Sequence, residues 1–164
     1  MSAQLTYGYS TPIGSAGGIF DLSEHVIDTF LNEENTGVMK FGLGVVQGTK
    51  PGINIKLPTA SATAADFEGI TTNNRTTEYD LEGGLAIRKA ASVGVMRYGR
   101  IYGRVVDGVT IAYADPVYMI PSGDNAGMFT NVSTNNVAVK GRFLSAVDSA
   151  NKVAVIELFN QAQS

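Results

Sequence analysis

From Met39 onward, short runs of apolar and β-branched residues alternate with Gly, Pro, Asn and Asp. The runs recur at fairly regular intervals, a pattern that is typical of β-sandwiches and β-barrels. The 19 glycines among 164 residues suit the turns and bulges that many short strands need, because glycine adopts backbone conformations that a Cβ atom obstructs. The sequence therefore predicts an all-β fold, a compact β-barrel or β-sandwich of short strands.

The apolar runs predict ten strands, of which the last two are the clearest. Only Ser149-Ala150-Asn151, a turn of hairpin length, separates them. Phe143 and Val147 lie on one face of the penultimate strand and are expected to point into the interior. Asp107-Gly108 suits a second tight hairpin. The expected strands cover residues 38–46, 52–57, 68–72, 85–89, 92–99, 104–106, 116–120, 128–130, 138–148 and 152–159.

Residues 1–22 have a different character from the rest of the chain. They are mostly small or polar, interrupted by Gly and Pro, and show no sustained periodicity. We interpret them as an extended N-terminal arm that precedes a β-rich body over residues 23–164. An arm without a core of its own either lies across its own domain or becomes ordered against a neighbour.

At most one short helix is expected, and it would begin at Ser23. This residue can cap the helix, and Val26, Ile27, Phe30 and Leu31 follow at roughly helical spacing. The same β-branched residues also fit a strand. Residues 59–66 are small and are expected to form a loop or one helical turn.

The composition excludes several classes of function. The chain has no cysteine and one histidine, so it offers neither a thiolate metal site nor the usual groups for acid–base catalysis. The net charge is −3, and the basic residues are dispersed, so no footprint for nucleic acid is present. No run of about 18 apolar residues occurs, and no signal-peptide pattern begins the chain. We therefore expect no enzyme activity, cofactor, metal, small-molecule substrate, nucleic acid or membrane partner.

The residues that could suggest chemistry have simpler interpretations. His25 is expected to be exposed at the start of the helix or in the arm. Residues 42–48 lack the Lys-Ser/Thr of a phosphate-binding loop and fit a strand with a glycine bulge. The carboxylates lack the spacing of a calcium loop and are expected to be solvated loop charges; they include Glu33, Glu34, Asp66, Glu68, Glu78, Asp80 and Glu82.

Five segments, at residues 9–19, 39–48, 67–70, 92–101 and 141–147, carry a resemblance to a known family. Their glycine-and-hydrophobic patterns and their order resemble those of the structural cement (capsid decoration) proteins of tailed bacteriophages. The resemblance covers most of the chain and includes no catalytic motif. It implies a β-rich body, often a homo-trimer, that binds the outside of the capsid and bridges neighbouring subunits of the major capsid protein.

On this interpretation the chain is a virion protein of the capsid surface, made in the cytoplasm of the bacterial host. The candidate capsid-binding residues are Tyr7, Tyr9, Pro12 and Ile13 of the arm. Two alternatives remain open. One is another structural component of a phage head or tail, and the other is a carbohydrate-binding β-sandwich with Tyr98, Tyr102 or Tyr113 as sugar platforms.

Overall fold

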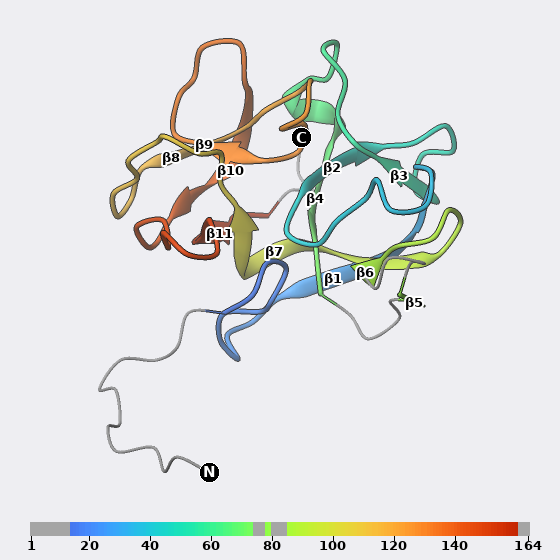
Figure 1. Ribbon diagram of the computed structural model, residues 1–164, viewed down its shortest axis with the longest axis horizontal. Coiled ribbons are helices and arrows are strands. Elements are labelled where there is room, and N and C mark those ends of the chain that lie inside the picture. The colour runs from blue at the N-terminus through green and yellow to red at the C-terminus, as the bar shows by residue number, and fades with distance from the viewer. Residues whose placement is uncertain (1–13, 74–77, 80–84, 161–164) are drawn as a thin grey trace.

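The computed structural model describes residues 14–73, 78–79 and 85–160, which form two lobes of β-strands (Figure 1). Within this part of the chain there is no α-helix, and one 3-10 turn, Ala64–Asp66, falls in the segment expected to be a loop or helical turn. The all-β prediction is confirmed. The strands are β1 (Val26–Asn32), β2 (Gly44–Gln47), β3 (Asn54–Lys56), β4 (Phe67–Thr71), β5 (Glu78–Tyr79), β6 (Leu85–Ala86), β7 (Ser92–Arg104), β8 (Pro116–Met119), β9 (Phe129–Thr130), β10 (Val137–Phe143) and β11 (Val153–Leu158).

The first lobe is a closed five-stranded barrel, on the right in Figure 1. Its strands follow the order β1-β3-β2-β4-β7, and β7 pairs with β1 to complete the ring. One buried cluster contains side chains from β1, β2, β3 and β7, so this cluster fills the barrel. Its strand residues are Phe30, Val45, Ile55, Val93 and Val95.

The 13-residue strand β7 belongs to both lobes. Its first half, Ser92 to Tyr98, pairs with β1, and its second half, Gly99 to Arg104, pairs with β11. Gly99 lies at the boundary with a φ of +123°, a conformation that favours glycine. The second lobe, on the left in Figure 1, continues in the order β7-β11-β10-β8-β9.

The two lobes share one hydrophobic core. Val95 and Met96 are consecutive on β7 and therefore point to opposite faces. Val95 belongs to the cluster that fills the barrel, whereas Met96 belongs to a larger cluster with Phe129 and Phe143 of the second lobe. The outer surface of the barrel is thus packed against the second sheet in this larger cluster, while the barrel also keeps the smaller cluster inside it.

The predicted C-terminal hairpin is confirmed, with a longer connection than expected. β10 and β11 are antiparallel, and Phe143 lies opposite Ile156. β10 ends at Phe143, so residues 144–152 form the connection. Phe143 is completely buried, as predicted, and Val147 is partly buried against the same cluster from within the connection.

Two local predictions are wrong. The segment from Ser23 to Leu31 contains β1 instead of a helix, because its backbone pairs with β7 over six residue positions and its β-branched side chains fit a strand. At Asp107-Gly108 the turn forms, with a φ of +81° at Gly108, but residues 109–111 do not form a return strand. Val105 instead forms a parallel bridge with Phe129, so the second sheet curves back onto β7.

Candidate functional site

The end of the N-terminal segment lies as an extra strand against the second half of β7. Gly17 N–H donates to the Tyr102 carbonyl at 2.8 Å, and Tyr102 N–H donates to the Gly18 carbonyl at 3.0 Å. Phe20 N–H then donates to the Arg100 carbonyl at 3.0 Å. This edge of β7 is therefore covered by the chain's own residues 17–20.

Small residues in this segment allow the close approach. A Cβ atom on Gly14 would lie 2.3 Å from Cε2 of the Tyr102 ring. A Cβ atom on Gly17 would lie 2.7 Å from the backbone nitrogen of Asn73, and Gly17 also has a φ of +76°. The Phe20 ring completes the contact by packing edge-on against Tyr102, with 5.8 Å between the ring centroids.

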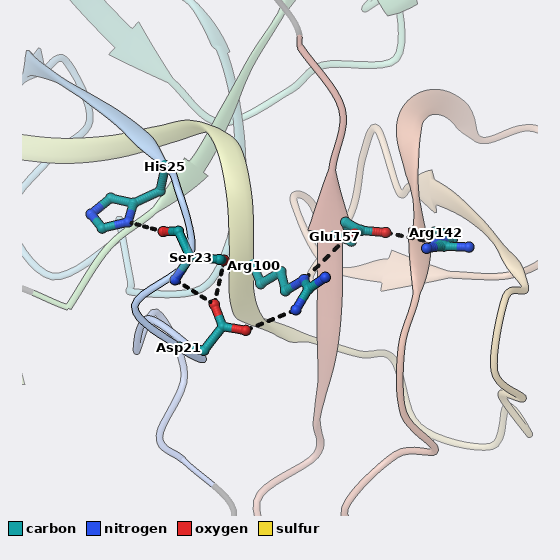
Figure 2. Close-up of polar contacts among 6 residues, drawn as sticks. All are labelled: Asp21, Ser23, His25, Arg100, Arg142 and Glu157. Carbon is teal, nitrogen blue, oxygen red and sulfur yellow. Dashed lines mark hydrogen bonds and ion pairs between the residues drawn. The ribbon is translucent and has the colours of Figure 1, made fainter.

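A charged row of four side chains, Asp21, Arg100, Glu157 and Arg142, crosses the strands beside this segment (Figure 2). Arg142 on β10 lies directly opposite Glu157 on β11, which lies directly opposite Arg100 on β7. Arg142 Nε donates to Glu157 Oε2 at 2.6 Å, and Arg100 Nε donates to Oε1 at 3.2 Å. Arg100 Nη1 donates to Asp21 Oδ2 at 2.8 Å. The row thus ties three strands and the N-terminal segment together.

The two carboxylates of the charged row stay ionised to lower pH than ordinary carboxyl groups. Partial burial acts to raise the pKa of Glu157, but the hydrogen bonds from Arg142 and Arg100 outweigh it, and the pKa is lowered. The hydrogen bond from the Ser23 hydroxyl is the largest cause of the lowered pKa of Asp21, and Arg100 lowers it further. Both groups are therefore held as anions by cationic or hydroxyl donors, which suits a structural role.

His25 is exposed, as predicted, although it precedes a strand and not a helix. Its Nδ1 donates to the Ser23 carbonyl at 2.8 Å (Figure 2). Ser23 N–H donates to Asp21 Oδ1 at 3.1 Å, and the Ser23 hydroxyl donates to the same oxygen. These contacts order the exposed link between the N-terminal segment and β1.

A hollow of about 340 Å³ lies over the charged row and has apolar side chains on its wall. Tyr98 and Phe159 line it, and both are substantially exposed. Phe20 is also exposed, and Leu22, in the link to β1, is fully exposed. Exposed apolar residues next to polar groups are typical of protein interaction surfaces.

A second ionic cluster links three strands of the barrel, β1, β4 and β7. Arg97 on β7 lies 3.3 Å from Asp28 Oδ2 on β1 and 3.3 Å from Glu68 Oε2 on β4. The expectation that Glu68 is a solvated loop charge is wrong, because Glu68 is a buried strand residue paired with Arg97. Among the residues that the structure describes, no group of three or more His, Cys, Asp or Glu could hold a metal ion, and no helix is long and apolar enough to cross a membrane.

The candidate capsid-binding residues Tyr7, Tyr9, Pro12 and Ile13 lie outside the described residues. Of the three candidate sugar platforms, Tyr102 is buried beneath the N-terminal segment. Tyr98 and Tyr113 are exposed. The guanidinium carbon of Arg142 lies over the Tyr113 ring, 5.8 Å from the centroid of that ring.

Sequence reasoning did not find the charged row. Asp21 and Arg100 are 79 residues apart, and Arg100 and Glu157 are 57 residues apart, so no local motif unites them. The only available signal was alternation: a charged residue within an apolar strand at Arg100, and another at Glu157. Those two positions indicate that Arg100 and Glu157 face outward from their strands, but they do not indicate that the two side chains pair with each other.

Both the family models and the solved structures contain significant matches to this chain. The family model described as "Structural cement protein (E217 gp24/Pam3 gp6)" matches residues 3–159. A chain in the solved structure "The capsid of Myoviridae Phage XM1" has the same fold, with a TM-score of 0.70 and 23% sequence identity over 96% of this chain and 98% of that chain. No curated protein matches the sequence significantly.

Proposed function

Because this chain belongs to the structural cement proteins of bacteriophages, we propose that it binds the outside of the capsid and stabilises the shell by bridging subunits of the major capsid protein. The single observation that carries the proposal is the family match, which extends over residues 3–159. The family consists of structural phage proteins, which are not an enzyme class, and the protein is accordingly a component of the virion.

The physical properties of the body support a bracing role. A strand shared by two lobes and a common core make the body one rigid unit. A rigid unit that binds only the assembled shell stabilises the shell by mass action, without any chemistry. The exposed apolar residues around the charged row offer a surface for such contacts.

In this proposal the arm (residues 1–22) and the body (residues 23–164) have separate tasks. The body docks on one capsid subunit, and the aromatic and apolar residues of the arm, Tyr7, Tyr9, Pro12 and Ile13, contact the next. Two linked weak contacts give an attachment stronger than either alone. The protein is made in the host cytoplasm and assembles as a homo-trimer on the capsid surface, which multiplies the number of linked contacts.

Co-sedimentation with capsids tests the proposal. Purified protein is mixed with expanded, undecorated capsids of its own phage, and unexpanded procapsids serve as the control. We expect saturable binding to the expanded shells, and greater resistance of those shells to heat. An absence of binding to the matched expanded shell would refute the proposal. The mass of the free protein in analytical ultracentrifugation tests the trimer separately.

A further inference from the structure

One side of β1 is only partly paired. On this side, Leu31 N–H donates to the Ile53 carbonyl at 2.9 Å, and the parallel pairing with β3 begins there. Because backbone groups alternate along a strand, the N–H and carbonyl of Thr29 point to the same side as those of Leu31. β3 does not reach Thr29, since Ile53 N–H donates instead to the Lys50 carbonyl at 3.1 Å. Thr29 is exposed, and within the described part of the chain no strand covers this edge.

Two hollows lie beside the first half of β1, with volumes of about 480 and 460 Å³, and Thr29 lines the second of them. Asp28 and Arg97 line both hollows, and we refer to the two together as the groove. Glu24 and Tyr98 also line the hollow over the charged row, which contains Arg100 and Arg142 and is not counted as part of the groove. The lining residues on this part of the chain run from Glu24 to Phe30, which is the length of a typical short strand.

The charge of the groove is acidic. Its lining contains the carboxylates of Glu24, Asp28 and Glu68, against the single guanidinium of Arg97. Arg97 is already shared between Asp28 and Glu68. Glu24 is exposed and forms no ion pair among the described residues, and the side chain of Asp28 is 46% exposed. The groove therefore favours a cationic side chain from outside.

We propose that the free edge of β1 binds an extended segment of the capsid protein by β-strand addition, with a Lys or Arg of that segment placed between Glu24 and Asp28. Backbone hydrogen bonds to Thr29 provide register, and the acidic groove provides selectivity. A second copy of this chain fits poorly, because pairing of two β1 edges would bring the carboxylates of both copies together. This inference rests on the proposed function, since the shell supplies the segment.

The test compares Thr29→Pro with Thr29→Val on expanded capsids, with the wild-type protein in parallel. Proline removes the N–H that points away from β7 and blocks an added strand, whereas valine keeps the N–H and changes only the side chain. We expect Thr29→Pro to bind about tenfold more weakly or worse, and Thr29→Val to bind like the wild type. If folded Thr29→Pro binds like the wild type, the inference fails. If the wild type itself does not bind, the proposed function fails.

Two further measurements do not depend on how well the proline variant folds. Glu24→Lys should weaken binding by about tenfold, while Asp124→Lys, on an exposed loop of the second lobe, should not. Hydrogen exchange at the Thr29 amide should be fast in free protein and slow on the decorated shell. Equal binding by the two lysine variants, or an unchanged Thr29 amide on shells that do bind protein, would overturn the inference.

Discussion

Arg100 and Glu157 lie directly opposite each other across the ladder between β7 and β11, and their side chains meet with 3.2 Å between Nε and Oε1. On its other side, Glu157 also receives a hydrogen bond from Arg142. One carboxylate therefore lies between two guanidinium groups that would otherwise repel each other across the sheet. The charged row should contribute to stability through this carboxylate more than through either arginine alone.

Glu157→Gln should lower the free energy of unfolding by about 1 kcal/mol, because it removes the anion that pairs with Arg142 and leaves Arg100 with Asp21 alone. Denaturant unfolding with a fluorescence or circular dichroism signal measures the change. Asp107→Asn is a suitable control, since Asp107 pairs with Lys152 at an exposed turn. That substitution should have less than half the effect. If Glu157→Gln and Asp107→Asn lower the free energy of unfolding equally, the charged row contributes no more to stability than an ordinary surface ion pair.

Stability should decline in acid because of the lowered pKa values of Asp21 and Glu157. A carboxyl group whose pKa is lower in the folded state stabilises the fold above its unfolded pKa and loses this effect as the pH falls through its folded pKa. The contribution should therefore be constant near neutral pH and disappear below the ordinary values of 4.5 for Glu157 and 3.8 for Asp21. Unfolding curves between neutral pH and pH 3 measure it, and Glu157→Gln should show a shallower decline.

Phe143→Ala should cost about 3–5 kcal/mol, because Phe143 is completely buried in the core that both lobes share. Val147→Ala should cost about 1 kcal/mol, since Val147 is only partly buried in the connection between β10 and β11. Chemical denaturation of both variants measures these values. A neutral Phe143→Ala would contradict the observed burial.

Gly17→Ala should detach the N-terminal segment from β7. The new Cβ atom would clash with the backbone of Asn73 and would also occupy a positive-φ conformation. Hydrogen exchange at the Tyr102 amide, which donates to Gly18, should become faster. Gly108→Ala is the matched control, because Gly108 has a φ of +81° with no atom within 4 Å of the added Cβ. Gly108→Ala therefore introduces the strain of a positive φ without a steric clash, and it should leave the Tyr102 amide protected from exchange.

The parts of the fold that could be predicted depend on local sequence. The C-terminal hairpin follows from two apolar runs and a short polar turn, and burial of Phe143 follows from strand alternation. The sequence left a helix and a strand both open for residues 26–31, because their apolar spacing fits either and the partner strand β7 lies about 65 residues away. β7 appeared as two strands, since Gly99 and Gly103 interrupt the apolar pattern although the backbone continues through both.

The interaction surface was less accessible to prediction than the fold. The composition of residues 1–22 predicts an arm, but the pairing of residues 17–20 with β7 depends on the close contact of Gly14 and Gly17 with residues far along the chain. Similarly, Glu68 looked like a loop charge because nothing near it in the sequence reveals its partner Arg97. Contacts of this kind are determined by the register of distant strands, which no local pattern specifies.

The sharing of β7 between the lobes has a mechanical consequence. A force that pulls the lobes apart along the direction of β7 loads its ladders with β1 and β4 on one side, and with β11 on the other, in shear. In shear, the hydrogen bonds of a ladder must break together, whereas in peeling they break one after another. The molecule should therefore resist stretching along β7 much more strongly than it resists a force that peels one strand of these ladders away from β7.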